Sequence, residues 1–195
     1  MVSSDGFAVR VGRRWRSAIG VMVLGVAVVG SGIARDDPRI SRIRKWYAAT
    51  EKGLPSNRVV RRDLAGLSSH GAVLTAYFAG DTIRKLNGVA YQENGKSTDD
   101  LYLRNDTVYY VSHIVGKYSL SMDGRLTHRV QYRMYYDGDT LIRWIDTTGK
   151  ELPVKTEAAN AQVKRDQEMA RILIACAKLA GQKQSCDIES GDSVR

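Results

Sequence analysis

Three segments of this chain carry the same order of residue types, and each predicts a tight β-hairpin turn. In each segment an aromatic or apolar run is followed by Gly or Asn, then by Asp-Thr, then by apolar residues; the segments are 76–83, 101–108 and 134–141. Gly and Asn tolerate positive φ, Asp bonds back to the local backbone, and Thr favours a new strand. This turn chemistry predicts antiparallel β-structure for the middle of the chain.

Two further turn signals, Asn94-Gly95 and Asp123-Gly124, lie between these segments. Five turns predict six antiparallel strands in sequence order, and the stretch 59–64 is compatible with a further short strand. The fourth predicted strand is apolar on both faces, so we expect the sheet to be covered twice there or strongly curved. The six predicted strands are 72–78, 81–91, 98–104, 107–120, 126–136 and 139–146.

Helical periodicity flanks the predicted sheet at both ends of the chain. Apolar residues recur at helical spacing over 39–52, between Pro38 and Gly53. A second helix is predicted over 156–180, and its second half is almost entirely apolar, which requires burial against the sheet. The fold class that follows is α+β, a twisted six-stranded antiparallel β-meander with an N-terminal helix and a C-terminal helix packed on it.

The first 34 residues predict an export signal. A basic stretch with four arginines precedes eighteen residues without a charge, which end in the small residues Gly32-Ile33-Ala34. Frequent Gly makes this run weakly apolar for a spanning helix, so we expect cleavage and a periplasmic protein. The alternative is an uncleaved inner-membrane anchor facing the periplasm. Residues 35–186 then form a single α+β domain, and 187–195 form a flexible tail.

Export changes how the charge is interpreted. The whole chain carries 30 Lys+Arg and 21 Asp+Glu; without four Arg and Asp5 of the signal, 26 against 20 remain, a net charge of +6. These charges are mixed along the chain, which argues against nucleic acid as a partner. An anionic polymer or another envelope protein is the expected partner, and a membrane only if the signal is retained. The alternative is that the positive surface serves solubility alone.

The two cysteines, Cys176 and Cys186, both lie near the C-terminus. In an oxidising compartment we expect them to form a structural disulfide that closes a short loop. The histidines are far away in sequence, so no metal site is predicted, and no cofactor is predicted either.

A resemblance supports the same compartment and fold. Segments 43–49, 80–86 and 132–146 resemble a loose group of small exported bacterial proteins. That group pairs an N-terminal I-R-x-x-Y helix with β-hairpins of the form Y-Y-x-x-G-x-L-I-R-W. The resemblance covers about residues 40 to 150 and implies a bacterial, exported β-meander. It implies no activity, and the C-terminal helix with its cysteines lies outside it.

No catalytic residue is predicted. Ser69 and His70 are adjacent in sequence, and neighbours on an extended chain point to opposite faces. We expect His113 to be half-buried and satisfied locally. With a two-residue turn at Asp123-Gly124, His113 would lie opposite Met134 in the next strand.

Tyrosine is the residue type that points most towards binding. Nine of the ten tyrosines lie between Tyr77 and Tyr136. In the doublets Tyr109-Tyr110 and Tyr135-Tyr136 we expect one ring on each face of the sheet. One face would combine tyrosine with arginine, which could stack on sugars or hold an acidic peptide. The alternative is that tyrosine is simply a favoured strand residue. The candidate ligand residues are Tyr118, Arg129, Arg133 and Tyr135.

These expectations favour an exported envelope protein that binds a ligand or serves a structural role without catalysis. The alternative is a hydrolase acting on cell-envelope polymers through carboxylates that come from separate segments. Such an enzyme would need two acids, or His113 and an acid, within about 10 Å in one cleft.

Overall fold

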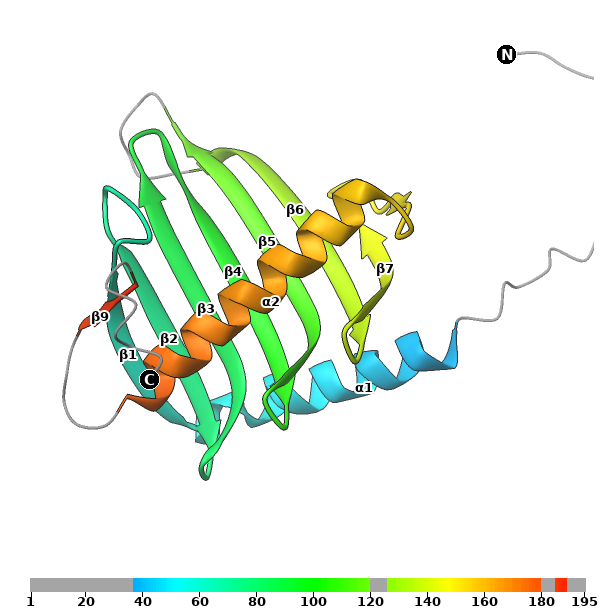
Figure 1. Cartoon of the computed structure of the whole chain (residues 1–195), viewed down its shortest axis with the longest axis horizontal. Coiled ribbons are helices and arrows are strands. Elements are labelled where there is room, and N and C mark those ends of the chain that lie inside the picture. Colours follow the sequence, from blue (N-terminus) through cyan, green and yellow to red (C-terminus); the bar gives the residue numbers. More distant parts are fainter. Residues whose placement is uncertain (1–36, 120–125, 180–184, 189–195) are drawn as a thin grey trace, which may run out of the picture. The chain divides into compact units, whose positions relative to one another are not determined.

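The strands form one nine-stranded sheet in the computed structural model (Figure 1). The structure describes residues 37–119, 126–179 and 185–188, which belong to a compact unit spanning Asp36–Arg195. Strands β1 to β8 follow one another along the chain and pair in antiparallel fashion, whereas β9 adds to β1 in parallel. The α+β fold class and the antiparallel meander are therefore confirmed.

The elements of the described residues have the following bounds: α1 Pro38–Gly53, the 3-10 turn η1 Leu54–Ser56, β1 Arg58–Ala65, β2 Ala72–Ala79, β3 Thr82–Gln92, β4 Gly95–Arg104, β5 Thr107–Tyr118, β6 Leu126–Asp137, β7 Thr140–Ile145, β8 Glu151–Leu152, α2 Glu157–Lys178 and β9 Ser185–Asp187.

The predicted number of six strands is wrong. The six predicted strands correspond to β2 through β7, and the structure adds β1, β8 and β9. Strand β1 lies where the sequence was compatible with a further strand. Strands β8 and β9 have two and three residues, which is too short for an alternating pattern to show in a sequence.

Tight turns close the three hairpins that the sequence pattern predicts. Asn105 and Asp106 join β4 to β5 with φ of 52° and 59°, the left-handed conformation that a type I′ turn requires at both central residues. Gly80 and Gly138 hold the equivalent first position of the other two turns, with φ of 60° and 58°.

Each of these three hairpins also contains a β-bulge at the same place. Pairing skips one residue of the second strand, the third residue after the two-residue turn; the skipped residues are Arg84, Tyr109 and Ile142. A bulge turns the side chain of the extra residue to a new direction. The prediction that the rings of Tyr109 and Tyr110 lie on opposite faces is therefore wrong, because both are buried against α1. The rings of Tyr135 and Tyr136 do lie on opposite faces.

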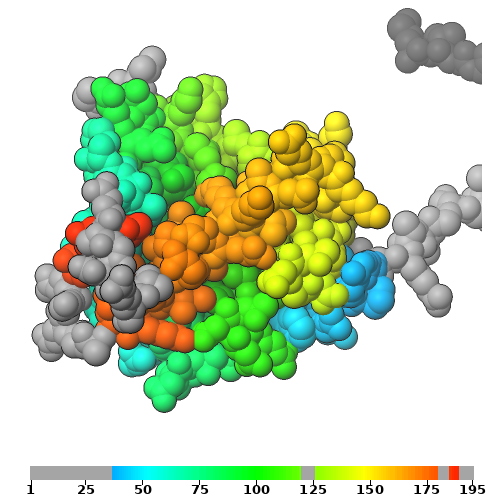
Figure 2. Space-filling model, viewed as in Figure 1, coloured from blue at the N-terminus to red at the C-terminus, as the bar shows by residue number. Residues whose placement is uncertain are grey.

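Helix α2 covers one face of the sheet (Figures 1 and 2). Thr156 caps its first turn by accepting a hydrogen bond from the Ala159 backbone N–H at 3.2 Å. Leu173 of α2 is fully buried against the sheet, and a Cβ on Gly88 would lie 3.4 Å from it, so the glycine leaves the space that the helix fills. Figure 2 shows α2 in orange lying across the strands.

Helix α1 packs on the other face. Ile40 and Ile43 are buried against a cluster of strand tyrosines that includes Tyr102, Tyr110 and Tyr135. Strand β5 therefore has core residues on both faces, as its apolar sequence led us to expect. Among the described residues, no helix is long and apolar enough to cross a membrane.

The register between β5 and β6 differs from the prediction by two residues. His113 lies opposite Tyr132 and not opposite Met134. Because side chains alternate with a period of two, this shift leaves the residues from Tyr110 to Lys117 and from His128 to Tyr135 on their predicted faces. The predicted turn at Asp123-Gly124 lies outside the described residues, as do the predicted signal segment and positions 189–195 of the predicted tail.

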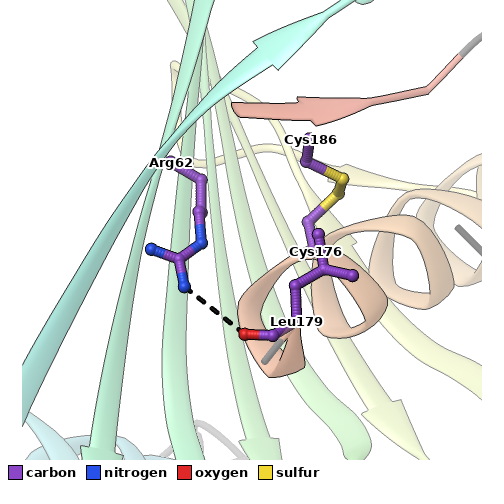
Figure 3. The surroundings of a disulfide bond; sticks show 4 residues. All are labelled: Arg62, Cys176, Leu179 and Cys186. Atoms are coloured by element: carbon purple, nitrogen blue, oxygen red, sulfur yellow. Dashed lines mark hydrogen bonds between the residues drawn. A yellow bond between two sulfur atoms is a disulfide. The ribbon is translucent and has the colours of Figure 1, made fainter. Parts of the chain in front are cut away.

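The predicted disulfide is present and joins α2 to the edge of the sheet (Figure 3). Cys176 lies near the end of α2 and Cys186 in β9, with their Cα atoms 5.7 Å apart. Nearby, the guanidinium of Arg62 donates to the Leu179 carbonyl at 3.4 Å. The disulfide thus holds β9 beside β1, close to the C-terminal end of α2.

Replacing Cys186 with Ala is expected to lower the free energy of unfolding by about 2.5 kcal/mol, because the cross-link no longer restricts the unfolded chain. Urea denaturation under oxidising conditions measures the change. Ser185→Ala, at the exposed neighbouring position, is the matched control. Equal stability of the Cys186→Ala variant and the wild type would contradict the expectation.

Candidate functional site

The four residues predicted as a ligand face lie on the α1 side of the sheet but do not converge. Arg129, Arg133 and Tyr135 alternate along β6, so the first and last lie about 20 Å apart. Tyr118 is the last residue of β5. Tyr135 is only 8% exposed and packs against Tyr110, so its ring belongs to the core. A ligand at Arg129 and Arg133 stays a prediction.

Ser69 and His70 contact each other, contrary to our expectation. The Ser69 Oγ and the His70 Nδ1 are 3.0 Å apart, because both residues lie in the turn between β1 and β2 and not on an extended strand. Both are exposed, and no carboxylate of the described residues bonds to His70. The pair therefore lacks the third group that orients a catalytic base.

His113 is half-buried and bonds locally, as expected. Its Nδ1 lies 2.6 Å from Asp99 Oδ1, and Arg165 of α2 donates to both oxygens of Asp99 at 3.0 and 3.2 Å. Burial alone would raise the pKa of Asp99, but the hydrogen bond from His113 and the charge of Arg165 outweigh burial and lower the pKa. These three side chains connect α2 to β4 and β5.

Arg165 continues this network to a second buried acid. Its other terminal nitrogen donates to Asp166 Oδ1 at 3.0 Å, and the Tyr136 hydroxyl donates to Asp166 Oδ2 at 2.6 Å. Burial raises the pKa of Asp166, although Tyr136, Arg165 and Gln162 all donate to its carboxylate. One guanidinium thus lies between two buried carboxylates.

A cavity of about 520 Å³ lies between α2 and the tips of the β4–β5 and β6–β7 hairpins. We call it the α2 groove. Asp106, Asp139 and Asp166 come from three separate segments and all line it. The rest of its lining is largely apolar and includes Val108, Ala170, Ile174 and Ala175.

A second cavity, of about 340 Å³, lies between the C-terminal half of α1 and the ends of strands β2 to β5. We call it the arginine pocket. Its polar and aromatic lining residues are Trp46, Thr50, Asn57, Arg84, Arg104 and Tyr109. Both cavities fall within the size range of pockets that hold small ligands.

The arginine pocket carries positive charge without a neutralising acid. Within the part of the chain that the structure describes, Arg84 and Arg104 are its charged lining residues, and neither forms an ion pair. The next residue along the chain behaves differently: Lys85 Nζ lies 3.2 Å from Glu51 and 3.5 Å from Asp100. The two guanidinium groups are therefore available to a negatively charged ligand.

The ring of Trp46 holds Arg104 in place. The Arg104 guanidinium lies 4.7 Å from the centroid of the Trp46 ring, and Arg42 lies 5.3 Å from it. Tyr109 packs edge-on against Trp46, and its hydroxyl lies 3.0 Å from that of Thr50. Burial raises the pKa of Tyr109 above its ordinary value, so its phenol stays neutral.

Sequence reasoning missed this pocket because two of its members owe their direction to β-bulges. Arg84 and Tyr109 are the extra residues of their hairpins, and strict alternation would have assigned them to the α2 face. Helix α1 gave the only usable signal: Trp46, Ala49, Thr50 and Gly53 share one side of a helix.

Comparisons with known proteins add no assignment. No protein family, curated protein or solved structure matches this chain. Among the described residues, no group of three His, Cys, Asp or Glu side chains could hold a metal ion. Any functional conclusion therefore rests on the geometry of the two cavities.

Proposed function

We propose that this chain is an exported bacterial envelope protein that binds an anionic ligand in the arginine pocket and acts without catalysis. Three features support export to the periplasm: the basic and then uncharged N-terminal sequence, the disulfide, and the resemblance to small exported bacterial proteins. The ligand belongs to the phosphate, sulfate or carboxylate class, because these groups fit the donors of an arginine.

The observation that carries this proposal is the pair of unneutralised arginines beside an aromatic wall. The ammonium group of Lys85, close by, is by contrast neutralised by Glu51 and Asp100. A guanidinium presents a planar fork of N–H donors that matches the two oxygens of an anionic group. Arg84 and Arg104 thus supply charge and direction, and Trp46 and Tyr109 supply a surface for the body of the ligand.

The pocket is also rigid enough to hold a ligand in one pose. Arg104 is stacked on a tryptophan that packs in turn on Tyr109, so little side-chain entropy remains to be lost on binding. Thr50 and Asn57 add neutral hydrogen-bonding groups to the lining. This combination favours capture and orientation, and the pocket contains no paired acid and base.

Replacing Arg84 with Ala, or Arg104 with Ala, is expected to lower the affinity for anions about tenfold or more, because each removes a charge-assisted hydrogen bond. Calorimetric titration with inorganic phosphate, sulfate and citrate measures this and separates the three anion classes.

Arg61→Ala is the matched control, because Arg61 is exposed, forms no ion pair with the described residues and lies outside the pocket. If Arg61→Ala and Arg84→Ala lower the affinity for anions equally, the loss reflects the net charge of the protein and not the pocket. Unchanged affinity in both pocket variants would refute the site.

A hydrolase is the second candidate, and the α2 groove is the observation that favours it. Its three carboxylates come from separate segments, and burial raises the pKa of Asp166, as a general acid requires. Asp139→Asn and Asp106→Asn would then abolish the release of fragments from purified envelope polysaccharide. Absence of fragment release by the wild type would remove this candidate.

A further inference from the structure

Two lysines flank the arginine pocket on the surface of α1. The pocket is lined on this helix by Trp46, Ala49, Thr50 and Gly53, and Lys45 and Lys52 stand four residues before and three residues after Ala49. Residues at these spacings are neighbours on a helix surface. The lysines therefore border the rim of the pocket, about 10 Å apart along the helix axis.

Both rim lysines are exposed and unneutralised. Neither forms an ion pair within residues 37–119, 126–179 and 185–188. The N-terminal half of the same helix differs, because Arg39 lies 2.7 Å from Asp37 and Arg42 lies 2.8 Å from Asp137. Free positive charge on α1 is thus concentrated beside the arginine pocket.

The acids nearest to this region do not cancel that charge. Glu51 lies on another side of α1, where it bonds to Lys85 and to the Tyr102 hydroxyl, 2.7 Å away. Asp81, in the turn next to the pocket residue Ala79, forms no ion pair with either pocket arginine. Two exposed lysines beside Ala49 thus add to the charge of the two pocket arginines.

A small anion cannot contact all four cations. It would fit between Arg84 and Arg104, and would leave Lys45 and Lys52 unused on the rim, with about 10 Å between them. A chain molecule with an anionic group in each repeat would place one group in the pocket and its neighbours beside the lysines.

We propose that the ligand of the arginine pocket is a linear polyanion, with one anionic group held by Arg84 and Arg104 and the flanking groups held by Lys45 and Lys52. This inference rests on the proposed function, because it extends the same site. A polymer fits the arrangement better than an anionic lipid surface does. Arg42 and Arg104 both lie over the Trp46 ring, so it is not free to enter a bilayer.

The salt dependence of affinity tests the number of contacts. The logarithm of the binding constant falls linearly with the logarithm of the salt concentration, and the slope grows with the number of anionic groups neutralised. We expect the slope for linear polyphosphate and for polygalacturonate to be about three times the slope for inorganic phosphate, because three anionic groups would be held instead of one. Equal slopes would overturn the inference.

Variants separate the rim from the pocket. Lys45→Ala with Lys52→Ala is expected to weaken polymer binding about tenfold or more and to reduce its salt slope by about two, with no change for inorganic phosphate. The control is Arg61→Ala with Lys164→Ala, which removes two exposed cations elsewhere on the protein.

The outcomes distinguish this inference from the proposed function. Polymer binding that survives in Lys45→Ala with Lys52→Ala overturns the extended site and leaves the pocket in place. Phosphate binding that survives in Arg84→Ala overturns the pocket itself. Tighter binding to vesicles of anionic phospholipid than to either polymer, lost in the lysine variant, would replace the polymer with a lipid surface.

Discussion

Replacing Arg165 with Met is expected to lower the free energy of unfolding by about 3 kcal/mol at neutral pH, because it leaves Asp99 and Asp166 buried without their shared cation. The two acids are 7% and 3% exposed, and Arg165 lies 3.0 Å from each. Methionine keeps most of the volume of the side chain, so the loss of charge dominates. This value is at the lower end of the range for breaking a buried ion pair, because the Arg165 side chain is itself 36% exposed.

The same variant is expected to recover part of this loss on acidification. Without Arg165, the pKa of both buried carboxyls rises, so the folded state binds protons that the unfolded state does not. Stability relative to the wild type then increases as the pH falls below the raised pKa values. Urea denaturation at neutral pH and near pH 4.5 measures both effects.

The control for this pair of measurements is Lys164→Met, which removes an exposed cation from the adjacent position of α2. We expect a change within about 0.5 kcal/mol at either pH. A deficit of Arg165→Met that stays constant with pH would show that lost packing, and not unpaired charge, is responsible.

Replacing Gly95 with Ala is expected to cost about 2–3 kcal/mol of stability, because an added methyl group would overlap the Gly116 carbonyl oxygen on the neighbouring strand. The obstacle is backbone, and the paired strands β4 and β5 cannot separate without losing hydrogen bonds on either side. Thermal and urea unfolding measure the change.

Gly53→Ala provides a matched comparison for this second substitution. Gly53 ends α1, and a Cβ there would meet nothing within 4 Å, so Ala should be neutral or slightly stabilising. If both substitutions lower the stability equally, the cause is backbone entropy and not the close approach of Gly95 to Gly116 on the neighbouring strand.

Much of the fold could be predicted because its signals are local. Turn residues such as Asn105-Asp106 dictate a backbone conformation whatever surrounds them, and the turn they predict is present. The helices extend over Pro38–Gly53 and Glu157–Lys178, close to the predicted 39–52 and 156–180, because periodic apolar positions persist over several turns. The cysteine pair was predictable because the chain has only two cysteines.

The missing parts depend on contacts that a sequence does not display. Strand β9 is a strand only because it lies beside β1, and the disulfide holds it there. The register of β5 and β6 was wrong by two residues, because a turn motif alone does not specify how many residues the connection uses.

The candidate site was the least predictable part. Sequence reasoning placed the ligand on Arg129, Arg133 and Tyr135, where alternation puts tyrosine and arginine on one face. The structure buries Tyr135 under α1. The cations that meet in a cavity are instead Arg84 and Arg104, from two different hairpins. Alternation could not identify Arg84, because a bulge changes the direction of its side chain.

The bulge in each of the three hairpins provides one residue whose side chain is not tied to the alternating order of its strand. The third residue after each hairpin turn leaves the alternating order, and here those residues are a cation, an aromatic ring and an aliphatic chain. Their backbone pairing is the same, so exchanging one for another alters the chemistry beneath α1 without a new strand register. A substitution at one of these positions would therefore change the surface beneath α1 and leave the face that packs against α2 unaltered.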